Sequence, residues 1–257
     1  MTAICKDQAI ILNTRPFKEN DLLVLFFGRN SGKISSIARS AKRSLKRFGG
    51  GLDSGSEVIA HFTVKSSSAL ATLSEIELLD GHLPLRRNIA HLSAAAYVIE
   101  LVMLATADEE ANEALYDLLS QSLSLLEERV TPTFIRAFEL KFLALLGYRP
   151  NCQTCTNCQA EVQRLKNDMY PFSIREGGLL CPHCTAEHKS VSHFLPEKSL
   201  FFLRALQRIA DLKDALQMSP APEITTSLDA LLPTFISHRL EKPLRSLAFL
   251  RSVLLKG

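Results

Sequence analysis

The stretch that decides the N-terminal fold is Asp21–Ala38, which reads DLLVLFFGRNSGKISSIA. It begins with an unbroken apolar run, Leu22–Phe27, which indicates a short strand because turn residues bound it on both sides. The next segment, Gly28–Lys33, looks like a phosphate-binding loop. However, its glycine spacing is one residue short, and Ile34 replaces the hydroxyl that would hold magnesium. We therefore predict a hairpin turn, followed by a second strand over Lys33–Ala38.

Three further segments in residues 1–80 have the character of short strands: Ala9–Leu12, Val58–Val64 and Leu70–Leu78. With the first two they make five strands separated by turn residues. This arrangement predicts a small β-barrel or a β-sandwich.

The connection between the third and fourth expected strands is strongly basic. The formal net charge of the chain is only +3, but the stretch from Gly28 to Leu52 has seven cations and neither Asp nor Glu. These cations are Arg29, Lys33, Arg39, Lys42, Arg43, Lys46 and Arg47. Such a block favours a polyanion, and the glycines at 49–51 let the chain approach one closely. The alternative is a solvated loop that only keeps the protein soluble.

Hydrophobic residues recur at helical spacing from about Leu85 onward. Thr131-Pro132 is a typical helix start, and Gly147 ends the helix that follows. Further helices are predicted over 88–107, 111–128, 196–216, 227–238 and 244–255. We expect an α+β multidomain chain with a barrel over 1–80, helices over 81–150, an insert over 151–186 and more helices over 187–257.

The insert contains two Cys-x-x-Cys pairs, Cys155-Thr-Asn-Cys158 and Cys181-Pro-His-Cys184, with 22 residues between them. Each tight turn points two sulfurs at one place, and Zn²⁺ is bound by four such ligands in a tetrahedron. We therefore predict one structural zinc ion on these four cysteines.

Other uses of these residues are open. Cys152 forms a third Cys-x-x-Cys with Cys155, but using it would lengthen the gap to 25 residues, so Cys152 is either a spare thiol or a replacement ligand. A catalytic zinc would need an open position, and His183 and His188 are nearby. Disulfides are the remaining alternative, which a reducing cytoplasm disfavours.

Several protein classes are excluded by the sequence. No apolar run reaches the roughly 18 residues that span a bilayer, and the N-terminus has no basic start followed by a long apolar core. The motifs of zinc deaminases and of serine hydrolases with a nucleophile elbow are missing. We expect a cytoplasmic protein without a membrane partner.

Other short motifs are spread along nearly the whole chain. Arg15-Pro-Phe-Lys-Glu-Asn-Asp21 stands near its beginning, and His238-Arg-Leu-Glu-Lys-Pro-Leu-Arg-Ser246 stands near its end. Between them lie Ser40–Arg47, Thr131-Pro132, Arg136–Leu140 and Leu146–Tyr148. Their order and spacing, together with the cysteine insert, resemble those of the RecO family of bacterial recombination mediators. The family's forms are Arg-Pro-Tyr-x-Glu-x-Asp, a basic loop, a central helix with its exit turn, and Gly-Lys-Pro-Leu-Lys-Ser.

The chain departs from the family pattern at four positions. Ser40, Gln159 and Glu241 stand where the family usually has glycine, and Cys152 stands where it usually has an apolar residue. These departures bear on loop geometry and leave the fold and the metal site as expected.

The resemblance implies an N-terminal OB-fold, a helical domain and an embedded zinc module. It implies a protein without enzymatic activity that binds single- and double-stranded DNA and anneals complementary strands in the RecF pathway, at the nucleoid. With RecR it would help load RecA onto DNA covered by single-stranded-DNA-binding protein, whose acidic tail docks on the helical domain. Arg136 matches a basic position near that docking pocket. The expected DNA contacts are the other six cations of the basic stretch, without Arg29: Lys33, Arg39, Lys42, Arg43, Lys46 and Arg47.

Two rival functions remain open. One is a zinc-stabilised helical adaptor that binds only protein partners. The other is a zinc hydrolase acting on nucleic acid, which would need an open position on the metal.

Overall fold

The structure, a computed structural model, describes residues 2–65, 70–164, 168–188 and 191–254. The chain divides into two units, Met1–Glu128 with Ala248–Gly257, and Arg129–Leu247. The four-part organisation expected from the sequence stays a prediction. The side chain of His188, and Leu255 at the end of the last expected helix, lie outside the described residues.

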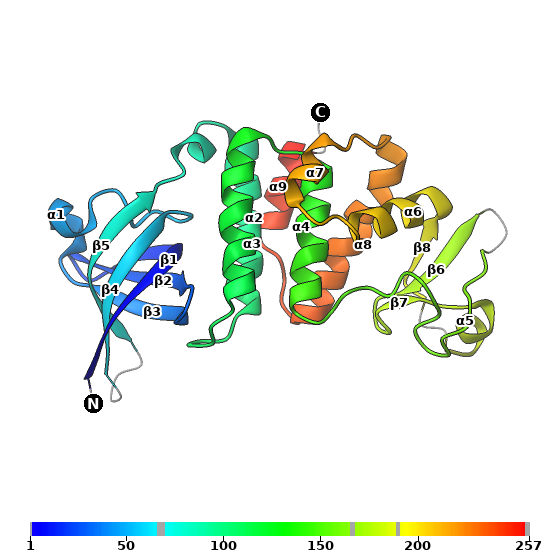
Figure 1. The fold of residues 1–257 in the computed structure, drawn as a ribbon, viewed down its shortest axis with the longest axis horizontal. Helices are drawn as coiled ribbons and strands as arrows, with labels where there is room; N and C mark the ends of the chain where they lie inside the picture. The colour runs from blue at the N-terminus through cyan, green and yellow to red at the C-terminus, as the bar shows by residue number, and fades with distance from the viewer. Residues whose placement is uncertain (1, 66–69, 165–167, 189–190, 255–257) are drawn as a thin grey trace. The chain divides into compact units, whose positions relative to one another are not determined.

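Five strands close into a barrel in the first unit (Figure 1). The strands are β1 Thr2–Phe17, β2 Asp21–Gly28, β3 Gly32–Ala38, β4 Glu57–Lys65 and β5 Ala71–Asp80. Their order is β1-β2-β3-β5-β4, with β4 pairing back to β1 and with β3 parallel to β5. The expected fold class, an OB-like barrel followed by helices, is confirmed.

The first strand is much longer than the sequence predicted. Ala9–Leu12 is only its middle part, because β1 pairs with β4 before this segment and with β2 after it. A bulge between Ile11 and Asn13 shifts the register, and the strand then continues to Phe17. The prediction stopped at Leu12 because the next four residues are polar or proline. These residues nevertheless continue the strand, because backbone pairing with β2 does not require apolar side chains.

Alternate residues of the strands fill the barrel, as the period of a strand requires. Val24 and Phe26 of β2 point inward with Phe62 of β4 and Leu73 of β5, and all four are at most 1% exposed. The rings of Phe26 and Phe62 meet edge to face with centroids 5.2 Å apart. The barrel therefore has its own apolar core.

After the last barrel strand, the first unit continues with further helices. They are the short η2 Leu83–Arg86, α2 Ile89–Ala105 and α3 Glu113–Glu128, with most of α9 Ser246–Leu254. Asn88 caps α2 by accepting a hydrogen bond from the Ala90 N–H at 2.8 Å. None of the described helices is long and apolar enough to cross a membrane.

The second unit combines helices with a small sheet. Its helices are α4 Pro132–Leu145, α5 Pro182–His188, α6 Glu197–Leu206, α7 Leu212–Gln217 and α8 Pro222–Leu240. Its sheet has the order β7-β6-β8, formed by Met169–Ser173 (β6), Gly178–Leu179 (β7) and His193–Pro196 (β8). Thr131 caps α4 as its position before Pro132 suggests, because its hydroxyl accepts from the Phe134 N–H at 3.0 Å.

The single helix expected over 196–216 is two helices, and this prediction was wrong. The chain breaks between α6 and α7, where the Lys141 ammonium donates to the carbonyls of Ile209 and Ala210 at 3.0 and 2.7 Å. Asp211 then caps α7 through the Lys213 N–H at 2.9 Å. A lysine from another helix thus satisfies backbone groups that a continuous helix would have bonded internally.

Candidate nucleic-acid interface and metal centre

The turn between β2 and β3 is the hairpin that the sequence predicted, with Gly28 opposite Gly32. Asp7 of β1 holds it, since its carboxylate accepts from the N–H groups of Asn30 and Ser31 at 2.9 and 2.8 Å. The Ser31 hydroxyl donates to the same oxygen at 2.7 Å. The backbone N–H groups that a phosphate-binding loop would offer to its ligand are therefore taken by a buried carboxylate.

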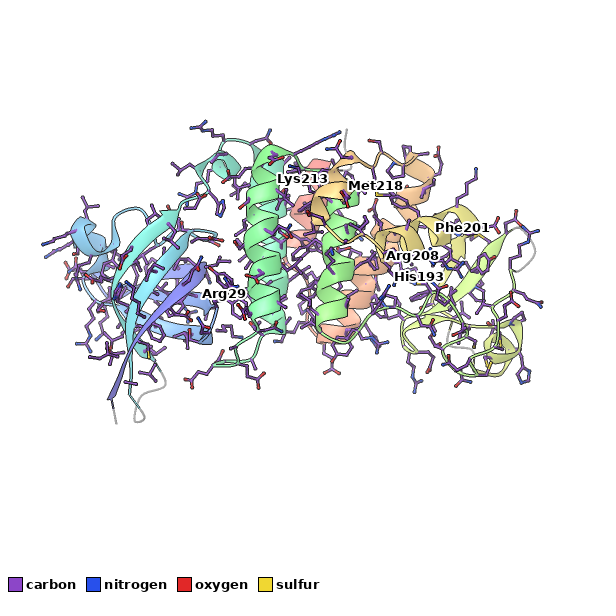
Figure 2. The ribbon with its side chains drawn as sticks, in the orientation of Figure 1. Arg29, His193, Phe201, Arg208, Lys213 and Met218 are labelled. Carbon is purple, nitrogen blue, oxygen red and sulfur yellow. The ribbon has the colours of Figure 1, made fainter. Side chains whose placement is uncertain are left out.

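The two cations of this turn face the helices of their own unit. The Lys33 ammonium donates to the Thr106 carbonyl at 2.5 Å, and it lies 3.3 Å from an Asp108 carboxylate oxygen. Arg29, labelled in Figure 2, donates from Nε to Glu113 at 2.8 Å. The Lys33 side chain is only 14% exposed. Lys33 therefore lies apart from the other predicted DNA contacts and binds the C-terminal end of α2.

The basic loop, defined here as residues 39–48, is held in a fixed shape. It contains the short helices η1 Ala41–Arg43 and α1 Leu45–Phe48. Ser40 enters the loop with φ 53°, and its N–H donates to the Asp21 carboxylate at 2.8 Å. Phe48 is 4% exposed and attaches the end of the loop to the barrel core. Little further ordering is needed for the loop to meet a ligand.

Four cations of the basic loop are exposed, and they are Arg39, Lys42, Arg43 and Lys46. The structure brings these four predicted contacts onto one loop. Exposed Glu19 lies 3.8 Å from Arg43, a distance at which solvent screens most of the attraction. The loop therefore presents a concentrated positive charge to solvent.

Arg47, the remaining predicted contact in the loop, is only partly exposed. Its guanidinium donates to the Arg39 carbonyl at 2.8 Å, to the Ser44 hydroxyl at 3.0 Å and to the Ser74 carbonyl at 3.3 Å. It also lies over the Phe48 ring at 4.9 Å. These contacts give Arg47 a part in the shape of the loop.

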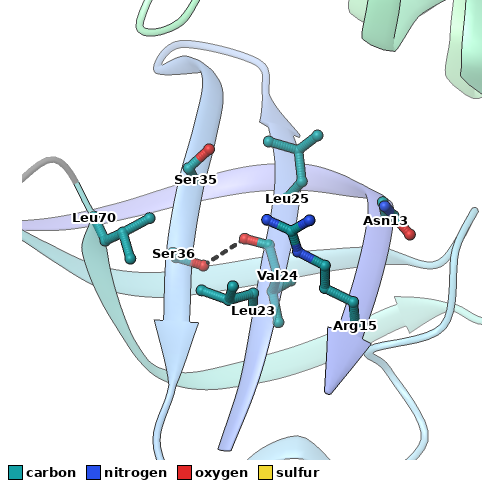
Figure 3. A pocket seen from close by; sticks show the side chains of 8 residues that line it. All are labelled: Asn13, Arg15, Leu23, Val24, Leu25, Ser35, Ser36 and Leu70. Carbon is teal, nitrogen blue, oxygen red and sulfur yellow. Dashed lines mark hydrogen bonds between the residues drawn. The ribbon is translucent and has the colours of Figure 1, made fainter. Parts of the chain in front are cut away.

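A hollow of about 200 Å³ lies on the face of β1, β2 and β3 (Figure 3). Asn13 and Arg15 come from β1, and Leu23 and Leu25 come from β2. Its floor is fixed by the buried Ser36 hydroxyl, which donates to the Val24 carbonyl at 2.8 Å. The hollow was not predicted from the sequence. Asn13 and Arg15 stand in the polar run that ends in Pro16, which lacks the apolar–polar alternation of a half-buried strand.

The four predicted zinc ligands meet at one point. The Sγ atoms of Cys155, Cys158, Cys181 and Cys184 all lie within 4.8 Å of one another, and Cys158 Sγ is 3.6 Å from Cys181 Sγ. Zinc–sulfur bonds of about 2.3 Å in a tetrahedron place the sulfurs roughly 3.8 Å apart. These four cysteines can therefore hold a metal ion of that size.

The surroundings of the sulfurs favour a bound cation. Burial raises the pKa of Cys155, but the backbone N–H groups of Cys158, Cys181 and Asn157 donate to its sulfur and lower the pKa to about 6. The Asn157 amide also lowers the pKa of Cys184, whereas burial and the neighbouring thiols raise it to about 12. The pKa of Cys155 thus favours a thiolate, while the raised pKa values of Cys158 and Cys184 mean that these two thiols resist ionisation until a cation compensates the added negative charge.

Cys152 lies outside the group of four. It is 1% exposed, and burial raises the pKa of its thiol to about 12. Its carbonyl accepts from Arg204 Nε at 2.7 Å. This environment favours a spare, protonated thiol over a replacement ligand. His183 is exposed, and the described group of meeting ligand atoms around Cys155 contains only sulfur.

The C-terminal motif of residues 238–246 contacts the cysteine insert through Arg239. The sequence did not predict this contact. The Arg239 guanidinium donates to the carbonyls of Ile174 and Arg175 at 3.0 and 3.2 Å. It also lies over the Phe235 ring at 4.8 Å. Arg239 of α8 therefore ties the turn after β6 to the helical part of the second unit.

Arg136, the predicted partner contact, is buried in α4. Its guanidinium lies 2.8 Å from Glu139 and 3.4 Å from Asp229, and its side chain is 6% exposed. Such a pair is strongly destabilised when one partner is removed, so this geometry favours a structural role. The expected contact with an acidic tail is supported only by the resemblance.

Comparisons with known proteins agree with this architecture. A family model described as the N terminal part of Recombination protein O matches residues 1–82, and the corresponding C terminal model matches residues 86–248. The DNA repair protein RecO of Symbiobacterium thermophilum is 32% identical over 252 residues, which cover 96% of this chain and 97% of the relative. The protein of the same name from Desulforamulus reducens is 29% identical over 247 residues, covering 96% and 94%.

Proposed function

Because this chain belongs to the RecO family of DNA repair and recombination proteins, we propose that it is a non-enzymatic mediator whose barrel binds DNA through the basic loop. The observation that carries this proposal is the set of four exposed cations on one fixed loop. Arg39, Lys42, Arg43 and Lys46 would each neutralise a phosphate and release its counterion. Such contacts position a nucleic acid without reading its sequence, which suits a protein that acts on any damaged site.

The hollow of Figure 3 supports a preference for unpaired DNA. Leu23 and Leu25 offer apolar surface, and Arg15 offers a planar cation that stacks on a base. The face formed by strands β2 and β3 is also the surface through which OB-folds usually bind oligonucleotides. We propose that phosphates follow the basic loop while bases turn toward this hollow.

Strand annealing follows from the same electrostatics. Two complementary strands repel each other through their phosphates, and cations on the basic loop reduce this repulsion. The protein would therefore bind double-stranded DNA as well, because the loop contacts the backbone and not the base edges. We place this activity in the bacterial cytoplasm, where the chromosome lies.

The protein partners are proposed from the family resemblance. RecR would act with the chain to load RecA onto DNA that single-stranded-DNA-binding protein covers. The acidic tail of that protein would dock on the helical second unit. The buried environment of Arg136 directs the search for this docking surface to exposed cations elsewhere on the unit.

We propose Zn²⁺ as the ion held by the four cysteines. Four thiolates complete a tetrahedral zinc and leave no position for a reacting water, so the ion would be structural. It would hold the two Cys-x-x-Cys turns together in an insert whose described part has only two short strands, β6 and β7, and most of the short helix α5. Binding of the ion would then contribute directly to the stability of the second unit.

A cysteine pair tests the zinc assignment with a matched control. Cys181→Ser should lose bound zinc, measured as zinc released per chain by a thiol reagent, and should lower the melting temperature. Cys152→Ser removes a buried thiol of the same insert and should keep one zinc per chain. Retention of zinc and melting temperature by Cys181→Ser would refute the assignment, and zinc loss in Cys152→Ser would make Cys152 a ligand.

The function itself is tested by filter binding of single-stranded DNA to the full chain. We expect binding that weakens steeply with salt, because the contacts are phosphate contacts. An adaptor that binds only proteins would show no such binding. A zinc hydrolase would degrade the strand in the same assay, which gel electrophoresis of the recovered DNA would reveal.

A further inference from the structure

The tip of the basic loop carries an apolar side chain that the barrel does not cover. Leu45, the first residue of α1, is 83% exposed, whereas Phe48 at the other end of this helix is 4% exposed. A single exposed aliphatic side chain is ordinary on a protein surface and by itself indicates nothing. The surroundings of Leu45 along the chain make this one different, because Arg43, two residues before it, and Lys46, directly after it, are exposed cations.

The loop holds Leu45 in place by contacts that do not involve its own side chain. The Arg47 Nε donates to the Ser44 hydroxyl at 3.0 Å, directly beside Leu45. The Phe48 N–H donates to the Ser44 carbonyl at 3.2 Å, which closes the helical turn. The backbone that carries Leu45 is thus already shaped, so binding would need to order little more than the Leu45 side chain itself.

The chemistry of the tip defines what it can bind. Arg43 precedes Leu45 by two residues, Lys46 follows it directly, and no Asp or Glu occurs between Gly28 and Leu52. A matching ligand has closely spaced anions with flat apolar groups between them. An unpaired nucleic-acid strand has this pattern, because each phosphate is followed by a base with an exposed face.

Resting on the DNA binding proposed above, we propose that Leu45 inserts between neighbouring bases of a DNA strand whose phosphates the flanking cations bind. Leucine is one of the apolar side chains that wedge between base steps. The insertion would separate stacked bases and hold the strand open to a complementary strand. Affinity would then depend on the presence of bases as well as on charge.

Tryptophan fluorescence tests the insertion directly. The chain has no Trp, so Leu45→Trp introduces a single indole at the tip. Ile4→Trp is the matched control, because Ile4 is 88% exposed on β1 and lies outside the basic loop. A single-stranded oligonucleotide should quench Leu45→Trp and leave Ile4→Trp unchanged. An abasic strand of the same length should bind without quenching either variant.

Affinity measured by fluorescence anisotropy of labelled DNA provides a second readout. Leu45→Ala should weaken binding of the base-bearing strand about 5-fold, near the low end of one stacked base. It should leave binding of the abasic strand and the salt dependence unchanged. Ile4→Ala should match the wild type for both strands.

The outcomes separate this inference from the proposed function. If the wild type binds DNA with steep salt dependence but Leu45→Trp shows no quenching at saturation, or Leu45→Ala weakens both strands equally, base insertion is wrong and DNA binding stands. If the wild type binds neither strand, both proposals fail. A fluorescence change of Leu45→Trp with phosphatidylserine vesicles, and none with DNA, would assign the tip to lipid and overturn the inference.

Discussion

The turn of residues 28–33 and the basic loop of residues 39–48 belong to one stretch without acids, but their cations meet different surroundings. In the turn, Lys33 binds carbonyls at the end of α2 and Arg29 binds carboxylates of α3. In the loop, Arg39, Lys42, Arg43 and Lys46 are exposed, and of these the Lys42 ammonium donates to the Glu19 carbonyl at 3.0 Å. The comparison teaches that charge density in a sequence locates a basic segment but does not say which of its charges are available to a ligand.

The largest effect is expected from reversing the charges of the loop. The combined variant with Arg39→Glu, Lys42→Glu, Arg43→Glu and Lys46→Glu should weaken binding of single-stranded DNA by about 100-fold or more, because attraction to phosphates becomes repulsion. Its melting temperature should stay close to that of the wild type, since exposed charges contribute little to stability. If this variant keeps the wild-type affinity for DNA, the exposed cations of the loop are not the phosphate contacts.

A stability effect is expected at the turn. Lys33→Met keeps the length of the side chain but removes the ammonium, leaving the Thr106 carbonyl without its donor. The free energy of unfolding should fall by about 1 kcal/mol in urea denaturation, the lower end of the cost of leaving a buried group without its partner, because this contact is partly buried. Lys46→Met in the loop is the control and should change it by less than about 0.5 kcal/mol. Equal losses at both positions would mean that the turn and the loop do not differ.

Arg47 lies in the basic loop, but we expect its substitution to affect stability, as in the turn. Arg47→Ala removes the donor to the Arg39 carbonyl and should lower the free energy of unfolding by about 1 kcal/mol. Its effect on DNA binding should come from a looser loop, so the salt dependence of binding should not change. Arg39→Ala should do the reverse, with little loss of stability and a shallower salt dependence. Calorimetry and salt titrations of both variants distinguish the two roles.

The smallest effect concerns the entry to the loop. Ser40 has φ 53°, a conformation that glycine adopts without strain. Ser40→Gly should therefore raise the free energy of unfolding by about 0.5 kcal/mol. Ser124→Gly, in the exposed part of α3, should instead lower it by about 0.5 kcal/mol, the difference between the helix propensities of serine and glycine. Destabilisation by both changes would show that strain at Ser40 is not relieved by glycine.

Features fixed by neighbouring residues could be predicted from the sequence. The cysteine quartet followed from spacing alone, because two residues between cysteines already define a turn that points both sulfurs one way. The departures from glycine also had a local meaning, since Ser40, Gln159 and Glu241 all have positive φ, at 53°, 63° and 53°. The family resemblance identified these three positions, and their positive φ explains why glycine is usual there.

Features fixed by distant residues could not be predicted. The carbonyls that receive Lys33 belong to residues 103 and 106, and the carboxylate beside Arg136 belongs to Asp229. Neither partner is visible in a local pattern, so both cations looked exposed. The break between α6 and α7 has the same origin, because Lys141 of α4 satisfies its carbonyls.

The salt dependence of single-stranded DNA binding tests the central claim most directly. If the four exposed cations of the loop are the phosphate contacts, the log–log slope of the wild type should be about −2.8. Lys33→Met should keep this slope, and the fourfold charge reversal should bring it close to zero. A wild-type slope of about −4.2, which six contacts would give, together with a shallower slope in Lys33→Met, would contradict the division between turn and loop.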